Sequence, residues 1–305
     1  MRQKDNPPRR GPWFVTPGPP KGTWFHIPGA AHWLILSGVL FLALLSCSSA
    51  PKKPAEVRVQ RNGAERQLEM ANQQAERGDF GGALSLLELA RQLAVTADDP
   101  GLRIRIALSR GNILFYQAKR EEAAREWEAA EAEADSSEDA ELAAVVRIYG
   151  ARGRLLGAMA EGKGAEAATA VKDDVGRAMD RIKKDRLSIA LGWTVIGLAE
   201  KESRRFNEAE AAVKKALAIH EKENYLEQAG YDWYLIASIR SIAGRFAGAE
   251  EALEEAIALD RRAENSWGLA MDWRALAEVY RKAGKTAQAE AAAARSAEIL
   301  QALGQ

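Results

Sequence analysis

The residue types that most often carry chemistry are scarce in this sequence. It contains one cysteine, Cys47, and three histidines, of which only His220 lies beyond residue 47. A single thiol can accept an acyl group, but it cannot form an intrachain disulfide or a cysteine-based zinc site. The sequence also lacks a glycine-rich phosphate loop, a nucleophile elbow and paired carboxylates in a defined setting. It therefore predicts a protein that is not an enzyme and that uses no metal and no cofactor.

Two further polar features have structural explanations. The acidic stretch from Glu131 to Glu141 lacks the residue spacing of a calcium loop. We expect Ser137, with the acidic residues after it, to begin a capped helix, where carboxylates favour the positive end of the helix dipole. His220 is expected near the end of another helix, where a basic side chain complements the negative end.

The composition favours a helical body. Seven of the ten prolines precede residue 29, and after Pro54 only Pro100 remains. The formal net charge is zero, but residues 1–46 carry five basic residues and one acidic residue, whereas the remainder carries 38 against 42. A mildly acidic body argues against nucleic-acid binding, which needs a basic face.

Cys47 lies directly after an apolar run from Ala30 to Leu45. This run is short for a bilayer span and follows a basic segment, as in secretory signals. Its end, Leu44-Leu45-Ser46-Cys47, resembles the bacterial lipobox. The resemblance implies cleavage between Ser46 and Cys47 and diacylation of the Cys47 thiol, which anchors the chain to a membrane. An uncleaved signal anchor with an incidental cysteine is the alternative.

These features predict three regions: a signal peptide with lipobox over residues 1–46, a lipidated cysteine and flexible tether over residues 47–63, and a folded body over residues 64–305. Ser48 and Ser49 stand where many Gram-negative lipoproteins retained in the inner membrane carry an aspartate. The resemblance therefore implies a lipid-anchored protein of the bacterial cell envelope, on the periplasmic face of the outer membrane.

One short pattern recurs along the body. Trp193, Trp233 and Trp273 lie 40 residues apart, and a period of this length marks stacked repeats. Helix pairs with small residues twelve and then seven positions apart are similar to tetratricopeptide repeats. The residues at these positions are small because only Gly, Ala or Ser lets two helices cross closely. The small positions are Ala71, Ala83 and Ala90; Gly111, Ala123 and Ala130; Gly197, Ala209 and Ala216; Ala237, Ala249 and Ala256; and Ala277, Ala289 and Ser296.

The resemblance implies an all-α, right-handed superhelical solenoid of about six hairpins of ~40 residues. Tetratricopeptide repeats usually have ~34 residues, so we expect the extra residues to lengthen each first helix at its start, as in the segment Asn265–Leu269. Repeats of the HEAT and armadillo type, at ~40–47 residues, are the alternative architecture. The tryptophans are expected to be core.

The third unit departs from the spacing. Leu155 and Asp174 stand where small residues belong, although Gly162-Lys163-Gly164 still predicts a turn between two helices. We therefore predict a hairpin here that is less regular than the others.

Functional residues are expected on the concave face of the solenoid. The inner-face positions of the family correspond here to Asn72, Asn112, Tyr116, Lys201, Tyr231, Tyr234, Arg274, Arg281 and Lys282. Asn72 and Asn112 match the asparagine with which chaperone-tail-binding members hold a terminal carboxylate. Leu68 and Leu108 replace the accompanying lysine, so that clamp is not expected.

The resulting hypothesis is a non-catalytic, membrane-anchored scaffold that binds a protein or peptide segment of the cell envelope and no nucleic acid. The alternative is an accessory lipoprotein that handles a small ligand and docks a substrate-binding protein of a tripartite transporter. Leu108 and Phe115 would suit that alternative if they are accessible to solvent, whereas Arg105 makes the same face less apolar.

Overall fold

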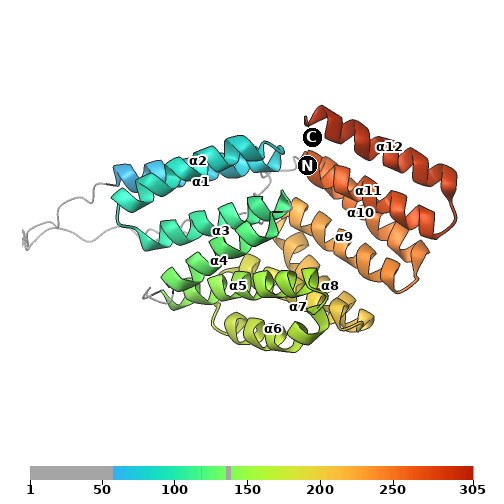
Figure 1. The fold of residues 1–305 in the computed structure, drawn as a ribbon, viewed down its shortest axis with the longest axis horizontal. Helices are drawn as coiled ribbons and strands as arrows, with labels where there is room; N and C mark the ends of the chain where they lie inside the picture. Colours follow the sequence, from blue (N-terminus) through green and yellow to red (C-terminus); the bar gives the residue numbers. More distant parts are fainter. Residues whose placement is uncertain (1–57, 118, 135–138, 305) are drawn as a thin grey trace, which may run out of the picture. The chain divides into compact units, whose positions relative to one another are not determined.

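The computed structural model describes residues 58–117, 119–134 and 139–304, which fold into twelve α-helices (Figure 1). The predicted signal peptide and lipobox, with Cys47, lie outside these residues. None of the helices in the described ranges is long and apolar enough to cross a bilayer. Consecutive helices form six pairs: α1 (Val59–Glu76) with α2 (Phe80–Thr96), α3 (Pro100–Tyr116) with α4 (Arg120–Ala134), α5 (Ala140–Ala160) with α6 (Gly164–Met179), α7 (Arg186–Glu202) with α8 (Phe206–Glu223), α9 (Leu226–Ile242) with α10 (Phe246–Ala263), and α11 (Ser266–Lys282) with α12 (Thr286–Ala302).

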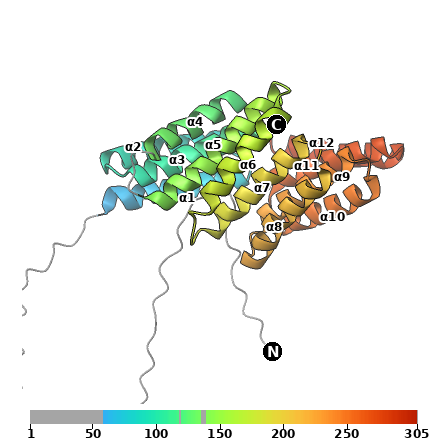
Figure 2. The same cartoon turned by 90° about the horizontal axis from the view of Figure 1, so that it is seen from below.

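The pairs stack in chain order (Figure 2). The second helix of each pair packs on the first helix of the next pair, from α2 on α3 to α10 on α11. The first helices of neighbouring pairs also contact one another directly: α3 contacts α5, α5 contacts α7, and α9 contacts α11. The predicted all-α array of six hairpins, packed like tetratricopeptide repeats, is thereby confirmed.

The small residues lie where helices cross, as their spacing predicts. Ala83, Ala209 and Ala249 are completely buried, and Ser296 is 4 % exposed. A methyl group at Gly111 would overlap the indole of Trp127, which is itself 1 % exposed. Packing of large side chains onto these flat positions forms most of the core.

The turns inside the pairs depend on left-handed backbone. Gly78, Gly162, Gly244 and Gly284 have φ between 73° and 80°, a region that glycine adopts without steric cost. In the fourth pair Arg204 takes the same position with φ 57°. Glycine therefore forms the left-handed position in four of the described turns, whereas the turn of the fourth pair has an arginine there.

The third pair is a hairpin like its neighbours. Leu155 is fully buried although it replaces a small residue, and Asp174 forms a 3.2 Å ion pair with Arg154. The hairpin predicted here is therefore present, with α5 and α6 as its two helices. The α5 helix is the longest of the described helices, with 21 residues.

The tryptophan ladder is less buried than its repetition suggests. Trp193, Trp233 and Trp273 are only partly buried, although Trp233 and Trp273 pack against the core. Lys215 Nζ lies 3.9 Å from the ring centroid of Trp193, and the Arg261 guanidinium lies 5.7 Å from that of Trp273. The expectation that the ladder is core is therefore wrong in degree. Basic side chains of the second helices α8 and α10 lie over two of the three rings.

His220 has a role beyond the expected one. It is 4 % exposed, and its Nδ1 lies 2.6 Å from Oδ2 of the fully buried Asp232, whose Oδ1 accepts a hydrogen bond from Thr194. His220 does lie in the last turn of α8, as expected, and the network also makes it a buried cross-link between α7, α8 and α9.

The residue that caps the start of α5 is Asp139 and not the expected Ser137. Asp139 accepts from the backbone N–H groups of Glu141 and Leu142, while Ser137 lies outside the described residues.

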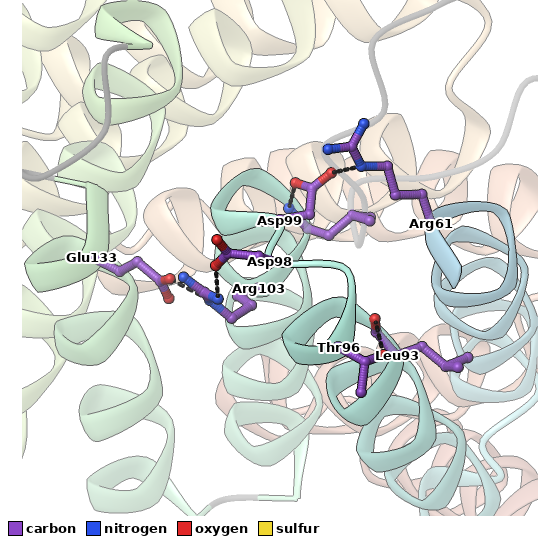
Figure 3. A network of polar contacts seen from close by, with 8 residues as sticks. Arg61, Leu93, Thr96, Asp98, Asp99, Arg103 and Glu133 are labelled. Carbon is purple, nitrogen blue, oxygen red and sulfur yellow. Dashed lines mark hydrogen bonds and ion pairs between the residues drawn. The ribbon is translucent and has the colours of Figure 1, made fainter. Parts of the chain in front are cut away.

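A polar network ties the first two pairs together (Figure 3). Asp99 accepts from the backbone N–H of Leu102 at the start of α3, and Arg61 of α1 forms a 3.2 Å ion pair with the same carboxylate. Arg103 of α3 pairs with both Asp98 and Glu133 of α4. The α1–α2 pair is thus held to the stack by polar contacts as well as by its apolar face.

Candidate functional site

A cavity of about 670 Å³ lies between residues of the first two and the last two helix pairs. Residues widely separated in the sequence meet there because the stack brings its two ends together. The lining residues are Phe80, Phe115, Tyr116, Gln117, Lys119, Arg120, Glu227, Tyr231, Tyr234, Asp260, Asn265, Trp267, Gly268, Met271, Asp272 and Arg274. Its volume falls within the range of ligand-binding pockets in proteins.

Two contacts join the ends of the array at this cavity. Phe80 at the start of α2 packs edge-on against Trp267 near the start of α11, with ring centroids 5.3 Å apart and planes at 81°. A Cβ atom on Gly78 would lie 3.6 Å from the side chain of Leu303, so the α1–α2 turn adjoins the end of α12. The cavity therefore has walls from both ends of the helical array.

Aromatic side chains supply much of the cavity wall. Tyr231 and Tyr234 of α9 are stacked, with ring centroids 6.1 Å apart, and Phe115 packs edge-on against Tyr116 at 5.8 Å. The buried Arg152 guanidinium lies 4.9 Å from the ring centroid of Phe115. Burial raises the pKa of the Tyr116, Tyr231 and Tyr234 hydroxyls, so these groups remain neutral hydrogen-bonding groups at neutral pH.

Two carboxyl groups lie on the same wall. Asp260 near the end of α10 and Asp272 within α11 are 3 % and 2 % exposed and are hydrogen-bonded to each other. Asn265 Nδ2 donates to Asp260 Oδ1 at 3.1 Å. Burial raises the pKa of Asp260 to about 7, and burial together with the neighbouring Asp260 raises the pKa of Asp272 well above its usual range. The pair therefore retains a proton near neutral pH.

Basic residues lie at other parts of the cavity. Lys119 and Arg120, between α3 and the first turn of α4, are exposed, as is Arg274 of α11. The cavity thus combines aromatic rings, a buried acidic pair and exposed cations. Such a mixture suits a ligand with both apolar and charged groups.

Four residues predicted from the inner-face positions line this cavity: Tyr116, Tyr231, Tyr234 and Arg274. The structure brings them together from the second, fifth and sixth pairs. Asn72 and Asn112 are buried instead, at 3 % and 2 % exposure, and do not line it. Asn112 hydrogen-bonds Tyr149 of the next pair, which explains its burial between repeats.

The other three predicted residues lie away from the cavity. Lys201, at the end of α7, is 3.7 Å from Glu202, and its side chain is 13 % exposed. Arg281 and Lys282, at the end of α11, both pair with Glu278 on the exposed surface. These three predicted positions therefore do not contribute to the cavity wall.

Several of the residues that line the cavity could not be predicted from the pattern of a single repeat. Phe80 and Trp267 lie at helix starts, Lys119 lies in a turn, and Asp260 and Asp272 belong to different helices. Of the two residues named for a ligand-handling role, Phe115 lines the cavity, whereas Leu108 is packed in the core at 1 % exposure. Asp260 and Asp272 interrupt the apolar pattern of their helices, and this interruption could have indicated a functional site in the sequence. Within the described ranges no group of three or more His, Cys, Asp or Glu residues is placed to hold a metal ion.

No family model and no curated protein sequence matches the chain. Solved structures do match its fold. A Rap protein complexed with Competence and Sporulation Factor superposes with a TM-score of 0.55 at 14 % identity, over 81 % of this chain and 78 % of that one. BtubC from P. vanneervenii gives 0.50 at 16 % identity, over 79 % and 92 %.

A third match is a signal-transduction ATPase of the STAND type with a tetratricopeptide-repeat sensor, from Pyrococcus horikoshii. It gives a TM-score of 0.51 at 14 % identity and covers 82 % of this chain but 42 % of that one. At these identities the likeness concerns the fold, and it agrees with the helix pairing and the buried small residues described above. The chain is a TPR-like helical repeat protein.

Proposed function

We propose that this protein is a non-catalytic interaction scaffold that binds a segment of a partner protein in the cavity between its first and last helix pairs. The observation that carries the proposal is the cavity itself, with its aromatic walls and charged groups. Tyrosine, tryptophan and arginine are the residues that dominate binding energy at protein interfaces. A volume of about 670 Å³ accommodates a few side chains of an extended segment rather than a folded domain.

The fold supports this choice of ligand class. Stacked helix pairs present the side chains of their first helices along a continuous surface. Each pair can then contribute a few contacts to a bound segment. The Rap structure with the comparable fold was determined with Competence and Sporulation Factor bound, so an array of this kind can accommodate a ligand.

The proposed location is the bacterial cell envelope, with the chain anchored by lipid on Cys47 and facing the periplasm. This part rests on the sequence Leu44-Leu45-Ser46-Cys47. Metabolic labelling with an alkyne fatty acid tests it: the wild-type chain should incorporate the label, and Cys47→Ala should not. Labelling and signal cleavage that both survive the substitution would exclude lipid anchoring through this thiol.

Binding in the cavity is tested by photo-crosslinking in the native cell. A benzoylphenylalanine at position 234 places the reactive group in the cavity wall, whereas the same residue at position 242 replaces Ile242, which is 48 % exposed on the same helix and outside the cavity. We expect a discrete protein adduct from position 234 and none of the same mass from position 242. Equal adducts from both positions, or none from position 234, would contradict binding at this site.

A further inference from the structure

The carboxyl pair in the cavity wall lacks the partners that buried carboxyls normally have. Asp272 is 2 % exposed, and its Oδ2 has no hydrogen-bond partner among the described residues. The donors near the pair are one side-chain amide, from Asn265, and the proton shared between the carboxyls. Burial of a carboxyl without sufficient donors is destabilising, and an amide or apolar side chain would avoid the cost. This arrangement therefore requires an explanation other than stability.

The surrounding backbone is also adapted to the pair. A Cβ atom on Gly230 of α9 would lie 2.8 Å from Asp260 Oδ1, and one on Gly268 of α11 would overlap Asp260 Oδ2. Glycine within a helix costs about 0.5–1 kcal/mol relative to alanine. Two helices thus carry a destabilising residue where the carboxyl group needs space.

The neighbours of the pair favour a positive ligand. Tyr231, Tyr234 and Trp267 line the same cavity, and aromatic rings attract ammonium and guanidinium groups in sites shielded from water. Carboxylates bind the same groups through charge-assisted hydrogen bonds. Since both carboxyls are nearly inaccessible, only a slender group such as an ammonium or guanidinium on a flexible chain can reach them.

We propose that Asp260 and Asp272, together with Tyr234 and Trp267, form a subsite that binds the lysine or arginine side chain of the segment held in the cavity. This inference rests on the proposed function and specifies the chemistry of its ligand. The incoming cation supplies the donors that Asp272 Oδ2 lacks. The exposed Lys119 and Arg120, on the α3–α4 side, are then available for carboxylate or carbonyl groups of the same segment.

Proton release gives this subsite a measurable signature. The raised pKa values of Asp260 and Asp272 mean that the empty pair holds a proton near pH 7. A bound cation favours the ionised carboxylates, so binding displaces that proton into the buffer. The other titratable residues of the cavity wall are Glu227, Tyr116, Tyr231, Tyr234, Lys119, Arg120 and Arg274.

The test uses the full chain, solubilised in a mild detergent, and a random library of acetylated, amidated hexapeptides. We expect the retained peptides to be enriched in lysine or arginine at one position. Replacement of that residue by norleucine, and the Asp272→Asn variant, should each weaken binding about tenfold or more, and the two changes together should weaken it little further. Calorimetry in buffers of different ionisation enthalpy should show proton release for the wild type and less for Asp272→Asn.

Matched variants separate the possible outcomes. Lys282→Gln removes a charge from an exposed side chain outside the cavity and should leave both binding and the preference for a basic residue unchanged, whereas Asp260→Asn should reduce that preference. Retained peptides that are acidic or show no charge preference, or that bind Asp272→Asn as tightly as the wild type, overturn the subsite and leave the scaffold function standing. A library from which no peptide is retained, together with no adduct from position 234, contradicts both proposals.

Discussion

Phe80 in the first helix pair packs edge-on against Trp267 in the last, with ring centroids 5.3 Å apart. The two residues are 187 positions apart in the sequence. Repeat proteins are usually stabilised by neighbouring contacts alone, so a contact between the ends couples units that would otherwise open independently. The cavity depends on this contact because both rings belong to its wall.

The first prediction concerns that coupling. In a double-mutant cycle, Phe80→Leu and Trp267→Leu should show a coupling energy of about 0.5–1.5 kcal/mol, which is typical of aromatic pairs. Urea unfolding provides the free energies. Hydrogen exchange of the single variants should increase in α1 and α2 more than in α5 and α6. Additive effects, with no selective change in exchange at the first pair, would show that the ends are energetically independent.

A second prediction compares two tryptophans. Trp127 is 1 % exposed and packs against Gly111, whereas Trp193 is partly exposed beneath Lys215. Trp127→Ala should therefore cost about 3–5 kcal/mol, and Trp193→Ala about half as much or less. Urea denaturation followed by circular dichroism measures both. A larger loss at Trp193 would contradict the partial burial of the ladder.

Two glycines should respond in opposite directions to the same substitution. A Cβ atom at Gly197 would lie 2.5 Å from a methyl group of Val213 and 3.2 Å from the carbonyl oxygen of Ala209, so Gly197→Ala should destabilise by about 1–3 kcal/mol. At Gly157, within α5, a Cβ meets no atom within 4 Å. Gly157→Ala should stabilise by about 0.5–1 kcal/mol, because alanine favours the helix. Thermal melts of the two variants distinguish the effects by their sign.

The buried acidic pair should make stability depend on pH. The folded state raises the pKa of Asp260 to about 7 and also raises that of Asp272, so it binds protons more tightly than the unfolded chain. Stability from this pair is therefore complete below about pH 4 and is lost progressively as the pH rises from there through 7.

Asp272→Asn should remove part of this loss and raise stability at pH 8 by about 1–3 kcal/mol. Urea midpoints at pH 5 and pH 8 measure the change, with the exposed Asp173→Asn as the control. An Asp272→Asn variant that is less stable than the wild type at pH 8 would show that the pair is structural.

Glu210 should show the opposite dependence at acidic pH. Burial opposes its ionisation, but hydrogen bonds from Arg240 and Lys214 outweigh this effect and lower its pKa to about 2. Its contribution is complete above the usual glutamate range and is lost as the pH falls towards 2. Glu210→Gln should cost about 2–3 kcal/mol at pH 7, because it removes the negative charge that lies 2.7 Å from the Arg240 guanidinium. Glu208→Gln, at a side chain that is 52 % exposed, should leave the midpoint of the same urea titration almost unchanged.

The sequence by itself determined the repeat. Alanine and glycine at intervals of twelve and seven specify where two helices can cross, and this constraint is local to each pair, so it can be recognised without knowledge of the fold. The same rule did not describe the third pair well, because the fully buried Leu155 occupies a position where the rule expects a small residue. Of the positions that the family resemblance assigned to the inner face, Tyr116, Tyr231, Tyr234 and Arg274 line the cavity.

Only the tertiary structure decided which of those residues share a site. Phe80 meets Trp267, and Lys119 lies in the same cavity wall as Asp272. Both arrangements depend on the small rotation between successive helix pairs, which accumulates over the whole array. No short stretch of sequence encodes that sum. The pairing of His220 with Asp232 and of Asp260 with Asp272 likewise depends on packing between helices, which places side chains from different repeats within hydrogen-bonding distance.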